Sequence, residues 1–187
     1  MKLERAIAAI VLVCTFAAPV AAGTFEDAVD AHARGDYAKA LRLIRPLAND
    51  GDASAQFNLG LMYTLARACS RTTRPQHYGF GKLQSRATPS PNPISGPYSE
   101  AMIWFRKAAE HGHRVARLYL GVMYGEGRGV PQDFVRAHMW FDLSAAQGEQ
   151  KAVKARDILE RSMTPAQIAE AQKLARDWKP ATQPTPH

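Results

Sequence analysis

The feature that most limits how this chain can fold is a segment that occurs twice, 36 residues apart. Ala101 to Gly112 reads AMIWFRKAAEHG, and Ala137 to Gly148 reads AHMWFDLSAAQG. Trp104 of the first copy therefore corresponds to Trp140 of the second. A fixed period of about 20 to 50 residues is typical of solenoids, in which each unit buries its apolar face by stacking on its neighbours.

Each copy has the spacing of an amphipathic helix. Ala101, Trp104, Phe105 and Ala108 recur at steps of three and four, which places them on one helix face. Residues 125–133 contain three glycines and one proline, which end one helix and begin the next. The sequence therefore predicts an all-α fold, an α-α superhelix, which is a right-handed solenoid of antiparallel helix pairs. We expect both tryptophans to anchor its core.

These residues resemble the Sel-one-like repeat (SLR) family, which is tetratricopeptide-like. The pattern is an LGxMY helix at Leu120 to Tyr124, a glycine-rich turn with an aspartate, and an AxxW helix ending in AAxxG at Ala137 to Gly148. Leu59 to Tyr63 and Ala101 to Gly112 supply the two halves of another unit. The resemblance covers roughly Asp52 to Gly148, and it implies an interaction scaffold, often exported in bacteria. It implies repeat positions at Leu59, Gly60, Tyr63, Ala101, Trp104, Ala108, Gly112, Leu120, Gly121, Tyr124, Gly129, Ala137, Trp140, Ala145 and Gly148.

The first residues are typical of an export signal. Lys2 and Arg5 precede an apolar run, and small residues end at Ala22. We expect residues 1–22 to be a signal peptide that is cleaved after Ala22. The alternative is an uncleaved anchor, although the apolar run is shorter than the roughly 20 residues that span a bilayer.

The remaining chain divides into a repeat domain and a cap. We expect the repeat domain over residues 23–163 and a C-terminal capping helix with a frayed tail over 164–187. Thr164 and Gln167 have the spacing of a capping box at the start of that helix. In the helix before it, Ala152, Ala155, Ile158 and Leu159 are predicted to face inward.

One segment interrupts the repeats. Ala66 to Pro97 has five basic residues, no acidic residue and no helical stripe, which predicts a loop or disorder. Codons can be chosen for Tyr78 to Ala87 so that a shifted frame spells WFRKAAEQG, nearly the text of Trp104 to Gly112. This suggests the hypothesis that Ala66 to Ser95 is a repeat translated out of frame, without an evolved role. The nucleotide sequence of the gene tests it.

The same segment explains the basic charge. The formal net charge is +7, of which the signal peptide carries +1 and residues 66–97 carry +5, which leaves +1 for the rest. A basic surface that could follow a phosphate backbone is therefore not expected on the helices. We expect no nucleic-acid partner and no stable membrane span after signal cleavage.

No constellation typical of an enzyme is found. Cys14 falls in the signal and Cys69 in the irregular segment, so the mature chain has no cysteine pair. Some exported members of the family that this chain resembles have disulfide bridges and activity towards β-lactams. Because the mature chain lacks a cysteine pair, that activity is not expected for it. His111 and His113 could form a metal pair, but a solvated helix end is the better interpretation.

Glu126 and Asp133 flank the repeat turn and could form a carboxylate pair. Turn and helix N-cap roles explain them better. We therefore expect no catalytic, cofactor-binding or metal-binding residue, and no cofactor.

The sequence thus favours an exported, non-catalytic scaffold, periplasmic or secreted, that binds a protein or peptide partner, as an envelope adaptor would. The candidate partner-binding residues, at solvent-facing positions on the concave side, are Gln56, Asn58, Arg117 and Tyr119. Two alternatives remain open: an envelope hydrolase acting on peptidoglycan or β-lactams, and a degraded, frameshifted repeat protein without function.

Overall fold

The computed structural model describes residues 24–72 and 96–180, and these ranges contain helices and turns but no strand. Residues 1–23 (which include the predicted signal peptide), 73–95 and 181–187 lie outside the described residues. The helices are α1 (Phe25–Ala33), α2 (Tyr37–Asn49), α3 (Ala53–Thr72), α5 (Pro97–Glu110), α6 (Arg114–Glu126), α7 (Phe134–Ala145), α8 (Gln150–Glu160) and α9 (Pro165–Asp177).

Local side-chain caps define where several helices begin. Thr24 and Thr164 each form a capping box, with Asp27 and Gln167 respectively. Such caps satisfy backbone N–H groups that have no partner within the helix. The capping box predicted at Thr164 is therefore confirmed, and α9 is separated from α8 as the sequence indicated.

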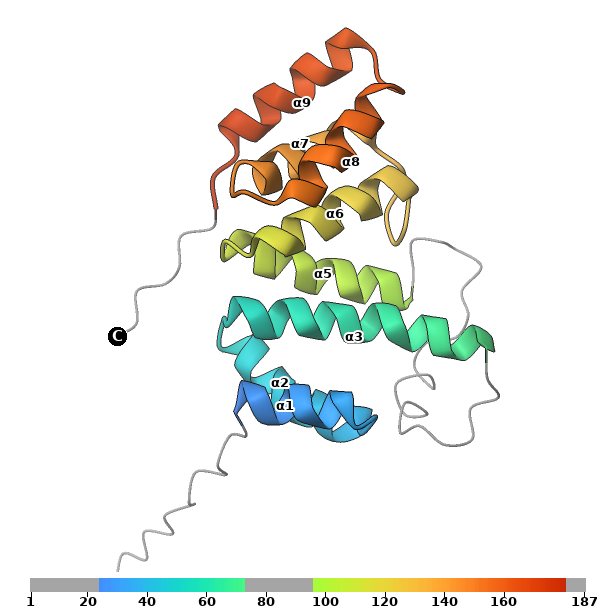
Figure 1. Ribbon diagram of the computed structural model, residues 1–187, viewed down its shortest axis with the longest axis vertical. Helices are drawn as coiled ribbons and strands as arrows, with labels where there is room; N and C mark the ends of the chain where they lie inside the picture. Colours follow the sequence, from blue (N-terminus) through green and yellow to red (C-terminus); the bar gives the residue numbers. More distant parts are fainter. Residues whose placement is uncertain (1–23, 73–95, 181–187) are drawn as a thin grey trace, which may run out of the picture.

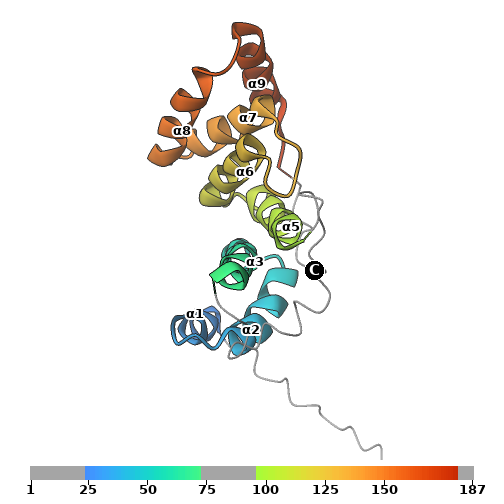
Figure 2. The same ribbon diagram turned by 90° about the vertical axis from the view of Figure 1, so that its right-hand side faces the viewer.

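The helices stack as an α-α superhelix, which confirms the predicted fold class (Figures 1 and 2). Successive helices pack as pairs: α1 with α2, α3 with α5, and α6 with α7, while α7 also packs against α8 and α9. One buried cluster extends over α1 to α3, and a second extends from α5 to the C-terminal helices. Trp104 of α5 packs against the first cluster, so the two clusters are joined.

The two central pairs repeat the same contacts. The Phe105 ring of α5 lies against Gly60 of α3, where an added Cβ would be 2.7 Å from the ring, and Phe141 of α7 lies against Gly121 of α6 in the same manner. The Tyr63 hydroxyl accepts a hydrogen bond from Arg45 at 3.2 Å. Tyr124 and Arg106 form the corresponding bond at 2.9 Å. The two halves that the sequence assigned to one unit, α3 and α5, therefore do pair.

The predicted start of the irregular segment is wrong. Helix α3 continues from Ala66 to Thr72, and α5 already begins at Pro97. The corresponding helix α6 ends where Gly127 adopts a left-handed conformation with φ 68°. By alignment of Gly60 with Gly121, α3 has Ala66 at that position, and no glycine or proline follows before Pro75. Without a residue that ends it, the helix gains two further turns.

Two expected core positions differ from the prediction. Trp140 is buried, but Trp104 is only half-buried. Ile158 is 64% exposed, whereas Ala152 is fully buried and Leu159 half-buried. The prediction for Ile158 was wrong because α9 packs against α7 and leaves that face of α8 without a neighbour. Within the described ranges, no helix has the length and apolar character that crossing a membrane requires.

Candidate functional site

The turns that join one helix pair to the next lie along one edge of the solenoid, at the left in Figure 1. We call it the turn edge: the α2–α3, α5–α6 and α7–α8 turns. Each turn contains a glycine at positive φ, namely Gly51 at 98°, Gly112 at 85° and Gly148 at 83°. L-residues with a side chain rarely adopt this conformation, so the glycines allow the chain to reverse tightly.

The turn edge presents two corresponding sites with different contents. Residues 48–63 correspond to residues 109–124 at an offset of 61, and α5 corresponds to α7 at an offset of 36. Gln56 of α3 therefore takes the place that Arg117 has in α6. We name the two places the Gln56 site (Ala48, Gln56, Lys107 and His111) and the Arg117 site (Ala109, Arg117, Leu143 and Gln147).

In the Arg117 site, a buried guanidinium joins the ends of two helices. Arg117 is 6% exposed, and its Nε and Nη2 both donate to the carbonyl of Ala109 in the last turn of α5 at 3.2 Å. Its Nη1 donates to the carbonyl of Leu143 in α7 at 3.4 Å. Helix C-termini carry partial negative charge, which favours a cation. Burial lowers the pKa of Arg117.

The chain itself covers the Arg117 site. Trp178, which follows α9 in an extended conformation, places its ring 4.6 Å from the Arg117 guanidinium. The same ring contacts Trp140 edge-to-face at a centroid distance of 5.8 Å. Cation–π and aromatic contacts of this kind hold the residues that follow the last helix against the turn edge.

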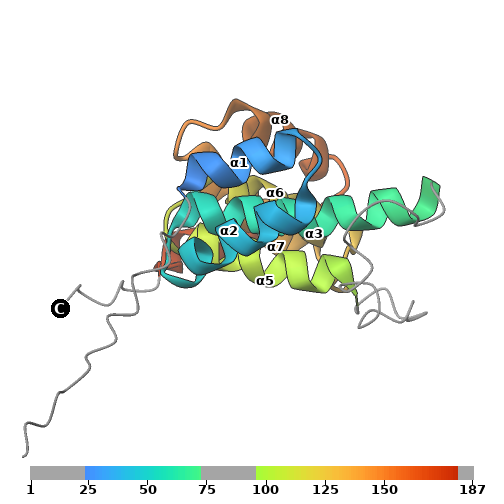
Figure 3. The ribbon, with the colours of Figure 1, turned by 90° about the horizontal axis from the view of Figure 1, so that it is seen from below.

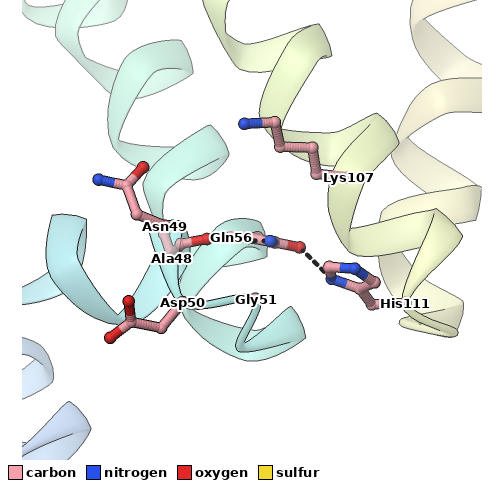
Figure 4. Close-up of a pocket in the computed structure, with 7 residues that line it drawn as sticks. All are labelled: Ala48, Asn49, Asp50, Gly51, Gln56, Lys107 and His111. Carbon is pink, nitrogen blue, oxygen red and sulfur yellow. Dashed lines mark hydrogen bonds between the residues drawn. The ribbon is translucent and has the colours of Figure 1, made fainter. Parts of the chain in front are cut away.

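In the Gln56 site the shorter amide takes the place of the guanidinium. Gln56 donates from Nε2 to the carbonyl of Ala48 at 2.9 Å, as Arg117 does to Ala109. Its Oε1 lies 2.9 Å from His111 Nδ1, which assigns the donor role to that nitrogen. A pocket of about 340 Å³ remains, lined by Ala48, Asn49, Asp50, Gly51, Gln56, Lys107 and His111 (Figure 4).

The four predicted partner-binding residues are separated by the structure. Gln56, at 2% exposure, and Arg117 are buried, so the prediction that they face solvent is wrong. The inward direction arises because each caps the preceding helix. Asn58 is half-buried and donates to the Ser54 carbonyl. Tyr119 is 36% exposed and contacts the rings of Phe57 and Phe105.

The other residues that the sequence singled out have structural roles. His111 is the C-cap of α5, and His113 is the N-cap of α6, where its Nδ1 accepts from the Ala116 N–H at 3.2 Å. Asp133 caps α7, as predicted, and Glu126 pairs with Arg128 at 2.6 Å. Over residues 24–72 and 96–180, no group of three side chains suited to a metal ion occurs.

The repeat positions are mostly small or apolar residues at helix contacts. Leu59, Ala101, Ala108, Leu120, Tyr124, Ala137 and Trp140 are buried, and Tyr63 and Ala145 are half-buried. Gly129, at φ 75°, lies against the backbone of Tyr98 at the start of α5, where a Cβ would be 2.7 Å from the Tyr98 carbonyl carbon. The α6–α7 turn thus packs against the beginning of α5, the second helix of the preceding unit.

Sequence reasoning missed a buried charged cluster between α7 and α8. His138 is 0% exposed, and its Nε2 lies 2.7 Å from Glu160 Oε1. Asp142 Oδ2 is 3.1 Å from Nδ1, within ion-pair distance but outside hydrogen-bond geometry. Arg156 donates to the other oxygen of Asp142 at 3.1 Å. The i, i+4 spacing of His138 and Asp142 on the inward face was the available signal.

Neighbouring charges shift the pKa values of the groups in this cluster. Burial alone would lower the pKa of His138, but the carboxylates of Asp142 and Glu160 outweigh burial and raise it. Burial would likewise raise the pKa of Asp142, but its close contacts with His138 and Arg156 outweigh burial and lower it. For His113, burial outweighs the charge of Asp52 and lowers the pKa, and the nearby charge of Arg114 acts in the same direction as burial.

Comparison with known proteins agrees with this architecture. The family model for the Sel1 repeat matches residues 53–65, 98–113 and 115–149. The chain is also similar to the crystal structure of a protective antigen present in uropathogenic Escherichia coli strains, which displays an SLR fold. The TM-score is 0.60 with 27% sequence identity, over 81% of this chain and 28% of that chain. A search of curated proteins finds no match.

The fold and its repeated contacts therefore define an all-helical repeat protein. The chain is a Sel1-like repeat protein, as the resemblance of its sequence implied. It spans less than a third of the length of the antigen to which it is similar.

Proposed function

We propose that this protein is an exported, non-catalytic scaffold that binds a protein or peptide partner in the cell envelope. Sel1 repeats are typical of interaction scaffolds, and stacked helix pairs provide a rigid extended surface. The observation that carries the proposal is how the buried polar side chains are used. Gln56, Arg117 and Ser144 all donate to backbone carbonyls of neighbouring helices.

The buried histidine supports the same conclusion. His138 is enclosed between two carboxylates that both belong to helix contacts, so its ring presents no nitrogen to a substrate. A general base must reach the proton that it removes, either directly or through one water. The pocket at the Gln56 site contains His111, whose Nδ1 is already engaged by Gln56.

The experiment is affinity capture from an envelope extract, followed by calorimetric titration of the purified protein with the purified candidate partner. We expect a saturable complex of defined stoichiometry. Turnover of a chromogenic β-lactam or of peptidoglycan by the purified protein would contradict the proposal and favour the hydrolase alternative. Export is tested separately, by cell fractionation and by the mass of the mature chain, which is expected to begin at Gly23.

A further inference from the structure

At the Arg117 site, part of the chain itself is bound against the turn edge. An extended segment runs past the ends of α5 and α7, and its Trp178 ring lies on the Arg117 guanidinium and against the edge of Trp140. The occupant is therefore an aromatic side chain on extended backbone. This ligand is supplied by the chain itself.

The Gln56 site has corresponding residues, and none of the residues that the structure describes occupies its pocket. Ala48 corresponds to Ala109, Trp104 to Trp140, and Lys107 to Leu143. Trp104 does not itself line the pocket; it is half-buried, and the Nζ of Lys107, which does line the pocket, lies 4.4 Å from its ring centroid. The pocket of about 340 Å³ opens between the last turn of α2 and the last turns of α5 (Figure 4). A volume of this size accommodates one aromatic side chain.

We propose that the pocket at the Gln56 site binds an aromatic side chain on an extended segment of a partner protein, with an acidic residue directly beside the aromatic one. The binding mode repeats the one that Trp178 shows at the Arg117 site. This inference rests on the proposed scaffold function, for which it names the pocket and the chemistry of the partner.

The charges of the pocket favour an acidic residue beside the aromatic one. Lys107 lies at one wall, and within the described part of the chain it forms no ion pair. Asp50 directs its carboxylate away from Gln56 and Lys107 (Figure 4). A carboxylate next to the bound ring would reach Lys107, while the ammonium group would attract the face of the ring. In the chain's own segment, Asp177 directly precedes Trp178.

The probe for the test is a synthetic peptide with the sequence of residues 176–182, RDWKPAT. It is titrated into the purified protein by calorimetry and by amide-resolved NMR. We expect shifts of the amide signals of Gly51, Gln56 and His111, and at least tenfold weaker binding when alanine replaces the tryptophan of the peptide. Shifts confined to the surroundings of Arg117 and Trp140 would overturn the proposal.

Two protein variants locate the binding. Asn49 is exposed at the pocket wall, so Asn49→Trp fills the pocket and is expected to lower the affinity at least tenfold. The matched control is Glu110→Trp, the same change at the corresponding position of the next turn, which should keep the affinity within twofold. Equal affinities for both variants would overturn the proposal.

A charge exchange tests the role of Lys107. Lys107→Glu is expected to lower the affinity for the peptide at least tenfold, and a peptide with lysine in place of its aspartate should recover most of that loss. Failure of the second peptide to recover binding overturns the acidic part of the proposal.

The chain's own tail is the competing occupant. A variant ending at Pro180 should bind the peptide within twofold of the full chain. A gain of tenfold or more would show that the residues after Pro180 occupy the pocket, which overturns a partner as its ligand. A captured envelope partner that binds Asn49→Trp with unchanged affinity would also overturn this inference, but it would leave the scaffold function standing.

Discussion

The phenyl ring of Phe105 lies directly on the backbone of Gly60, so α5 approaches α3 as closely as a helix without a side chain at that point permits. The ring is fully buried, and the same arrangement joins Phe141 to Gly121 in the next pair. A glycine inside a helix costs roughly 0.5–1 kcal/mol relative to alanine. Close helix packing, rather than helix propensity, therefore explains the residue at both positions.

Gly121→Ala is expected to destabilise the protein although alanine is the better helix former. The new Cβ would collide with the Phe141 ring, and overpacking of this kind costs about 1–3 kcal/mol. Thermal unfolding by circular dichroism measures the change. Gly125→Ala, in the same helix as Gly121, is the control. Its new Cβ would lie 3.7 Å from Ala137 Cβ of α7, an ordinary van der Waals contact, so this substitution should raise the melting temperature. Equal effects of the two substitutions would contradict the packing argument.

Arg117→Ala is expected to lower the free energy of unfolding by about 1.5–3 kcal/mol, the range for hydrogen bonds of a charged group. The substitution removes the donors to Ala109 and Leu143 and the cation under Trp178. Urea unfolding monitored by circular dichroism gives the value. Gln56→Ala, at the corresponding position, removes a neutral amide and should cost about 1 kcal/mol. A smaller loss for Arg117→Ala than for Gln56→Ala would refute this assignment.

His138 is expected to make the protein more stable at mildly acidic pH than at alkaline pH. Its pKa is raised above 6.5, so the stability that it contributes is complete below that pH and is lost as the pH rises through the folded-state pKa. Asp142, whose pKa is lowered from 3.8, contributes above that pH and loses its contribution as the pH falls further. The cluster therefore supports the fold best between pH 3.8 and pH 6.5.

The measurement is the free energy of unfolding at about pH 6 and about pH 8.5, together with an NMR titration of the histidine rings. His138→Gln should abolish the loss of stability with rising pH that the wild-type cluster produces. A titration of His138 below pH 6.5 would contradict the prediction.

The contribution of His113 to stability depends on pH in the opposite direction to that of His138. Because burial lowers its pKa, the stability that it contributes is complete above pH 6.5 and is lost as the pH falls. Asparagine is a good N-cap that does not titrate. His113→Asn should therefore keep α6 capped and remove the loss of stability as the pH falls below 6.5, while the loss above pH 6.5, which His138 produces, remains. An unchanged pH profile in this variant would refute a role for His113.

Replacing residues 64–97 by residues 125–133 is expected to keep the fold. The α3–α5 connection is longer than the α6–α7 connection by 25 residues, the difference between the offsets of 61 and 36. The shorter turn places Asp133 as the N-cap of the following helix, a role that it already has in α7. Circular dichroism should show a cooperative melt. Loss of cooperativity would show that the longer connection is needed for stability.

The repeat text was enough to predict the helix pairs. Trp104 and Trp140 identified corresponding helices, Asp133 and Thr164 identified helix starts, and the helices of the repeats were found by their spacing of small and apolar residues. These signals are local, because periodicity and caps depend on neighbours within about four residues. They can therefore be recognised from the sequence without knowledge of the tertiary structure.

The candidate site was much less predictable. Gln56 and Arg117 are polar and fall beside the apolar stripe, so sequence reasoning placed them in solvent. Only the position of the preceding helix end shows that each turns inward to a carbonyl. The roles of Trp178 and His138 depend in the same way on partners in other helices, which no local pattern reveals.

The extension of α3 beyond α5 indicates where a label can be attached to the protein. Helix α3 extends past the beginning of α5 on the side opposite the turn edge (Figures 1 and 3). A fluorophore attached at the end of α3 would therefore lie on the opposite side from Gln56 and Trp178. Such a label leaves the pocket at the Gln56 site free for binding measurements.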